Sequence, residues 1–122
     1  MKKKVLVVES LSPEVLETVE AVLKVWGYET ISATDAAEAC KVLEEVSPHL
    51  IIACFDRVEG DFQRVMDMAK KLSIPTLIST LDGVTPGILQ ELKRSGATEA
   101  LLEPIFLNRH ALRRTIEQLT AA

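Results

Sequence analysis

The chain has 122 residues and a mass of 13.4 kDa, with 48% hydrophobic and 26% charged residues. These values suit one globular domain over residues 1–122 and exclude a second domain of ordinary size. The formal net charge of -4 argues against a non-specific nucleic-acid or membrane-surface binder, because contacts with phosphate need clustered Lys and Arg.

At the N-terminus, three lysines precede a short apolar run. The run "VLVV" before Glu9 is shorter than the core of a signal peptide, which needs roughly 7 to 15 apolar residues. We therefore expect a cytoplasmic protein whose first strand covers residues 4–8. Two cysteines form neither a disulfide framework nor a metal-binding motif, so no cofactor is expected. Cys40 precedes Leu43 by three residues in a predicted helix and is interpreted as a small core residue.

Apolar runs alternate with amphipathic segments along the whole chain. Strands are predicted at residues 4–8, 28–33, 49–54, 75–80 and 97–102, and helices at 13–26, 35–46, 61–72, 86–95 and 108–122. Five apolar strands joined by helices require a parallel sheet covered on both faces. The predicted class is α/β, a doubly wound five-stranded parallel sheet with the flavodoxin-like order 2-1-3-4-5, the commonest for right-handed crossovers.

Capping residues mark the ends of the first two helices. Ser12 is predicted as the N-cap before Pro13, and Gly27 as the stop of the same helix. Asp35 and Glu38 have the spacing of a capping box at the start of the second helix. Five residues of the first helix share one apolar face: Val15, Val19, Val22, Leu23 and Trp26.

Ligands of this fold bind at the carboxyl ends of the strands, near the switch point between the first and third strands. The polar residues and the thiol expected there are Glu9, Ser10, Cys54, Asp56, Ser79, Thr80 and Glu103. The predicted site therefore holds carboxylates, hydroxyls and a thiol, but no Lys, Arg or His. His49 begins a strand at the opposite edge and His110 lies in the last helix, so both are expected to be solvated or to pack.

Four segments resemble the receiver domain of bacterial two-component response regulators. They are "VLVVES" (5–10), "PHLIIAC" (48–54), "IPTLIST" (74–80) and "GATEALLEPIF" (96–106). The resemblance covers nearly the whole chain. It implies a domain in which an aspartate is phosphorylated by a histidine kinase or a small phosphodonor with Mg²⁺. The helix at 86–95, the strand at 97–102 and the helix at 108–122 would then present a face to partners.

The residues at the family's functional positions depart from its pattern. The resemblance places Glu9 and Ser10 at the acidic pair that binds Mg²⁺, and Cys54 at the phosphoacceptor. Mg²⁺ prefers oxygen ligands, so a hydroxyl and a thiol in place of two carboxylates remove most of its site. We therefore expect no metal site and no phosphoaspartate at position 54.

The family's switch positions are only partly kept. Thr80 matches the switch hydroxyl, whereas Ala100 stands where the switch aromatic usually lies. Glu103 replaces the lysine that neutralises the phosphoryl group, which reverses the charge there. The chain is therefore interpreted as a degenerate receiver, or pseudo-receiver. It would not be an enzyme, and it would signal by protein–protein interaction.

Two chemical alternatives stay open. Cys54 could be a thiol-based redox switch, although neighbouring carboxylates and burial disfavour the thiolate. Asp56, two residues further on, could serve as a displaced phosphoacceptor.

The expected partners are proteins, such as a histidine kinase or an output domain, with no nucleic acid and no membrane. A homodimer is left open. The last two helices are expected to supply the interaction face, with their apolar residues divided between core and contact: Ile88, Leu89, Leu92, Leu112 and Ile116. Six basic residues on the helices are interpreted as solvated faces: Lys70, Lys71, Lys93, Arg94, Arg113 and Arg114.

Overall fold

The computed structural model describes residues 3–9, 13–54, 60–79, 86–94, 98–100 and 109–121. Its elements alternate between strand and helix, as the apolar pattern predicts. In chain order they are β1 (Lys4–Glu9), α1 (Pro13–Val25), β2 (Glu29–Ala33), α2 (Ala36–Glu45), β3 (Leu50–Cys54), α3 (Gly60–Lys71), β4 (Thr76–Ser79), α4 (Pro86–Arg94), β5 (Glu99–Ala100) and α5 (Arg109–Leu119).

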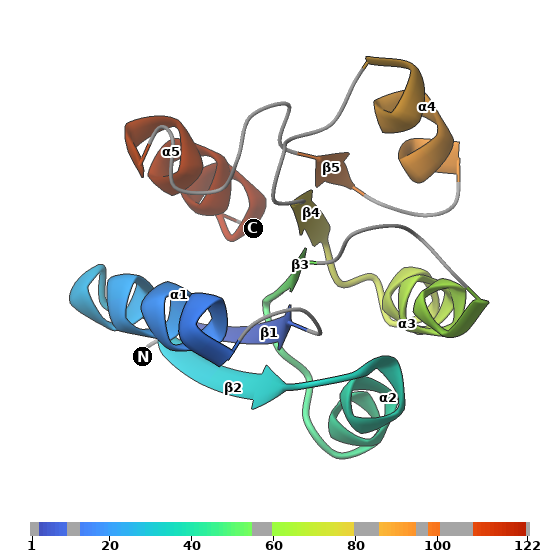
Figure 1. Ribbon diagram of the computed structural model, residues 1–122, viewed down its shortest axis with the longest axis horizontal. Helices are drawn as coiled ribbons and strands as arrows, with labels where there is room; N and C mark the ends of the chain where they lie inside the picture. The colour runs from blue at the N-terminus through green and yellow to red at the C-terminus, as the bar shows by residue number, and fades with distance from the viewer. Residues whose placement is uncertain are drawn as a thin grey trace.

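The strands pair in parallel in the order β2-β1-β3-β4-β5. Helices α1 and α5 lie on one side of the sheet, and α2, α3 and α4 lie on the other (Figure 1). The predicted α/β class, the parallel sheet and the order of the four longer strands are confirmed. No helix in the described ranges is long and apolar enough to cross a membrane.

The fifth strand is described only in its middle. Of the predicted residues 97–102, Glu99 and Ala100 pair with β4, Thr98 lies just before them, and residues 97, 101 and 102 lie outside the described part of the chain. At the start of this strand the hydroxyl of Thr98 accepts a hydrogen bond from the Thr76 backbone N–H at 2.8 Å. The Thr98 backbone N–H in turn donates to the Thr76 carbonyl at 3.0 Å, so Thr98 joins the start of β4 through both its backbone and its side chain.

Two cores form because the central strands are buried on both faces. Leu6 and Val8 of β1 pack with α2 and α3, whereas Val5 and Val7 pack with α1 and α5. This alternation follows from the two-residue period of a strand, and it gives β1 its continuous apolar run.

A Schellman motif ends α1, as Gly27 predicts. Gly27 has a φ of 91°, and its N–H donates to the Lys24 carbonyl at 3.0 Å. The Tyr28 N–H donates to the Leu23 carbonyl at 3.0 Å. The same pattern of bonds ends α3, but there a non-glycine residue, Ser73, takes the left-handed conformation with a φ of 58°.

The predicted capping box of α2 forms only in part. The Asp35 carboxylate accepts from the Glu38 N–H at 2.8 Å, as expected of an N-cap. The Glu38 carboxylate instead accepts from the Thr34 hydroxyl at 3.0 Å. The prediction that it returns to the N-cap backbone was wrong, because a hydroxyl one residue earlier offers a competing donor.

The predicted apolar face of α1 is confirmed. Val19 and Leu23 are buried, and the other three residues of that face are partly buried. Leu112 and Ile116 of α5 meet this face and are buried in the same core, so they are core rather than contact residues. A small cavity of about 10 Å³ lies between α1, β3 and α5 and is lined only by apolar side chains, which offer a water molecule no set of hydrogen-bond partners.

Candidate functional site

The carboxyl ends of β1, β3 and β4 form one edge of the sheet. Glu9 is in register with Cys54, and Cys54 is in register with Ser79. These three positions are therefore direct neighbours across three strands. The prediction that the strand ends bring them together is confirmed for these three positions, and their chemical roles stay predictions.

Glu9 and Ser79 are almost completely buried, at 3% and 1% exposure. Glu9 continues a strand whose four preceding residues are fully buried, so the pairing with β3 carries its carboxylate into the interior. Acidic side chains are rarely buried this far, and then only with compensating partners. The sequence marks Glu9 as a site residue but gives no signal of this burial, because a strand end is usually open to solvent.

Several predicted site residues lie outside the described part of the chain. They are Ser10, Asp56, Thr80 and Glu103. For Cys54 and Ala100 the backbone is described, as the last residue of β3 and of β5. The roles assigned to these six residues therefore remain predictions.

The three neighbouring strand ends are occupied by one acidic residue, one cysteine and one serine, namely Glu9, Cys54 and Ser79. A hard cation needs several oxygen ligands, and a thiol is a poor substitute. Across the described ranges, no three His, Cys, Asp or Glu side chains gather as a metal-binding group.

His49 lies at the amino-terminal edge of the sheet, as predicted, and is exposed. Its imidazole Nδ1 accepts a hydrogen bond from the Lys4 backbone N–H at 3.0 Å, and the His49 backbone N–H donates to the Lys4 carbonyl at 2.8 Å. His49 therefore satisfies the first donor of β1. Sequence reasoning missed this role, because it depends on the register between two strands 45 residues apart.

The other residues noted in the sequence lie away from this edge. Cys40 is partly buried against the core between the sheet and α2 and α3, close to the predicted core position. Lys70 and Lys71 on α3, and Lys93 and Arg94 on α4, are exposed, as expected for solvated faces. The side chains of the predicted contact residues Ile88, Leu89 and Leu92 are outside the described set.

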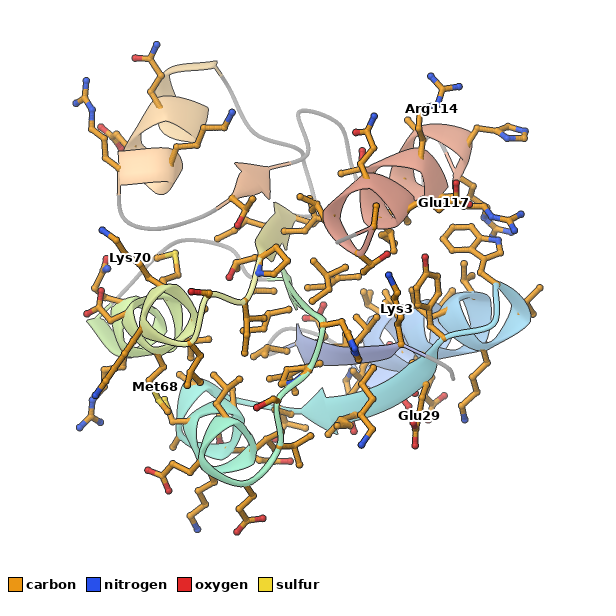
Figure 2. All side chains as sticks on the ribbon, turned by 180° about the vertical axis from the view of Figure 1, so that it is seen from behind. Lys3, Glu29, Met68, Lys70, Arg114 and Glu117 are labelled. Atoms are coloured by element: carbon orange, nitrogen blue, oxygen red, sulfur yellow. The ribbon has the colours of Figure 1, made fainter. Side chains whose placement is uncertain are left out.

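The outer face of α5 carries a group of basic residues, all exposed: Arg109, His110, Arg113 and Arg114. Arg113 also makes local contacts, because its Nε lies 3.1 Å from the Glu117 carboxylate and its guanidinium lies 5.7 Å from the centre of the Trp26 ring. It therefore links α5 to the end of α1. Arg114 and Glu117 are labelled on this helix in Figure 2.

Several solved structures of response regulators share this fold. The chemotaxis response regulator CheY4 of Vibrio cholerae matches with 26% identity and a TM-score of 0.81, over 98% of this chain and 99% of that one. A two-component response regulator from Clostridium difficile matches with 16% identity and a TM-score of 0.83, over 98% and 97%. The response regulator TrrA from Thermotoga maritima, in complex with Mg(2+)-BeF, matches with 21% identity and a TM-score of 0.78, over 96% and 98%. No protein-family model and no curated protein matches the chain.

Proposed function

We propose that this chain is a receiver-like signalling module of a two-component system, located in the cytoplasm, that binds protein partners without being switched by phosphoaspartate. One observation carries the proposal. The register places Cys54 between Glu9 and Ser79, at the strand end where the resemblance has the phosphoacceptor aspartate. A thiol there cannot form an acyl phosphate.

The remaining residues at the family's positions support the same conclusion. TrrA was solved with Mg(2+)-BeF, whereas this chain offers Ser10 at the position of the second metal carboxylate. Glu103 brings a negative charge where the resemblance has a lysine, so an incoming phosphoryl group would be repelled. The phosphoacceptor, the second metal carboxylate and the neutralising lysine are thus all replaced, by Cys54, Ser10 and Glu103.

A module that phosphorylation does not switch needs a surface that is always ready to bind. The α4–β5–α5 side is proposed as that surface, with a histidine kinase or an output domain as the kind of partner. Exposed basic residues on both helices support this choice, namely Lys93, Arg94, Arg109, Arg113 and Arg114. Arg113 is a poor site for testing it, because its contacts with Glu117 and Trp26 would be lost as well.

Intact-mass spectrometry of the wild-type protein tests the proposal. After incubation with acetyl phosphate and Mg²⁺, we expect the unmodified mass alone. A phosphate adduct would contradict the proposal, and fragmentation would show whether Asp56 carries it, as the displaced-acceptor alternative requires.

A further inference from the structure

The exposed side of α5 carries a cationic patch, defined here as the three arginines Arg109, Arg113 and Arg114, with His110 beside them. Arg109 and Arg113 are four residues apart, as are His110 and Arg114, so the four side chains lie together on two successive turns. Leu112 and Ile116 of the same helix are buried against the sheet. Figure 2 shows Arg114 pointing away from the rest of the molecule.

This patch works against the stability of its own helix. The first turn of a helix favours acidic residues because the macrodipole is positive there, and α1 and α2 follow this rule with Glu14 and Glu38. The first turn of α5 has no acidic residue and begins with Arg109. Arg109 and Arg113 also repel each other at a four-residue spacing.

The stability that α5 loses through these unfavourable charges suggests that the arginines serve a function. Local rules are broken mainly at functional sites, where the stability lost is compensated elsewhere. Within the described part of α5 only Glu117 offsets the charge, through its pair with Arg113. Arg109 and Arg114 have no such pair among the described contacts. Their guanidinium groups are suited to bind carboxylates in two-pronged hydrogen bonds.

We propose that the cationic patch on α5 is the docking site for an acidic segment of a protein partner, one that presents several Asp or Glu side chains. The proposal rests on the proposed function, in which the chain acts by binding proteins. An extended polyanion such as duplex nucleic acid or an anionic bilayer fits less well. The chain has 18 acidic against 14 basic residues, so a large anionic surface would also meet repulsion from the rest of the domain.

The probe is a synthetic helical peptide with glutamates spaced four residues apart, and its control has glutamine at those positions. Titration of the ¹⁵N-labelled full chain, followed by NMR and fluorescence anisotropy, locates the contact and measures its Kd. The test variant is Arg109→Glu with Arg114→Glu. The matched control is Lys70→Glu with Lys71→Glu, which reverses two exposed charges on α3; Lys70 projects from that helix in Figure 2.

We expect shifts centred on residues 109–117 with the glutamate peptide only. The α5 double variant should weaken binding about tenfold at low salt, and the α3 variant should change it little. The α5 variant should also melt close to wild type, because Arg109→Glu suits the start of a helix and offsets the new repulsion between position 114 and Glu117. A stable α5 variant with unchanged binding would overturn the proposal. So would equal binding of the glutamine peptide, tighter binding of duplex DNA or anionic vesicles, or dilution-dependent shifts showing that a second copy occupies the patch. None of these results involves phosphate. A negative result for peptide binding would therefore not decide whether the chain is phosphorylated, which mass spectrometry tests separately.

Discussion

At the scale of single residues, Cys54 decides between the structural and the redox interpretation of the strand-end site. If it only packs at the position where the resemblance has the acceptor, Cys54→Ser should lower the free energy of unfolding by about 1 kcal/mol. Binding of the acidic peptide should be the same with and without oxidant, in both the variant and the wild type. An oxidant-dependent change in wild-type binding that Cys54→Ser abolishes would replace our account with a redox switch.

Ser73 is the one non-glycine residue with positive φ among those described. A residue with a Cβ pays a conformational cost in the left-handed region, whereas glycine does not. Ser73→Gly should therefore raise the free energy of unfolding by roughly 0.5–1 kcal/mol in urea denaturation.

The matched control for Ser73 is Gly27, which ends α1 with the same pattern of hydrogen bonds. No atom lies within 4 Å of a Cβ built at Gly27, so Gly27→Ala tests backbone conformation without a clash. It should lower stability by about 1 kcal/mol. If both substitutions moved stability in the same direction, the conformational explanation would be wrong.

Thr76 has a buried hydroxyl that accepts or donates no hydrogen bond within the described residues. Its side chain is fully buried, so the hydroxyl loses its contact with water without compensation. Thr76→Val keeps the shape and removes the hydroxyl, and we expect it to raise the free energy of unfolding by about 1 kcal/mol. Ser79, also buried but with a partner, serves as the comparison, since Ser79→Ala should destabilise.

At the scale of elements, α1 and α5 are held together by apolar packing around a small cavity. Leu23 lines that cavity and is 1% exposed, whereas Val25, two residues further on, is 84% exposed. Leu23→Ala would enlarge a space that already fails to close, so it should cost about 3–5 kcal/mol. Val25→Ala should change stability by less than about 0.5 kcal/mol. Similar melting temperatures for the two variants would contradict this packing.

The ends of the elements show how far the sequence could predict the fold. Gly27 was predictable because glycine at a helix end signals the left-handed conformation, whereas Ser73 takes the same conformation without any such signal. The capping box was half predicted, since spacing identifies Asp35 as the N-cap but cannot reveal that Thr34 competes for Glu38. Local sequence patterns thus predict where helices begin and end. Which hydrogen bonds form at those ends depends on the donors that neighbouring side chains offer.

At the scale of the whole molecule, the apolar runs were enough to predict the sheet and its strand-end site. The neighbours Glu9, Cys54 and Ser79 follow from the strand order and from where each run ends. The burial of Glu9 and the contact of His49 with β1 were not predictable, because both depend on packing between distant segments. The unfavourable charge at the start of α5 was predictable, because the helix expected at 108–122 already places Arg109 in the first turn.

We propose that several positions together prevent phosphotransfer, so no single substitution toward the receiver pattern should enable it. Cys54→Asp alone would add a carboxylate beside Glu9 with no cation to offset it. Adding Ser10→Asp should recover some Mg²⁺ binding, and adding Glu103→Lys should supply the missing positive charge.

Intact-mass spectrometry after acetyl phosphate and Mg²⁺ measures this directly across the wild type and the single, double and triple variants. We expect no adduct on the wild type, little on Cys54→Asp, more on the double variant and ready phosphorylation of the triple variant alone. A phosphate adduct on the wild type, or full modification of Cys54→Asp by itself, would contradict the account.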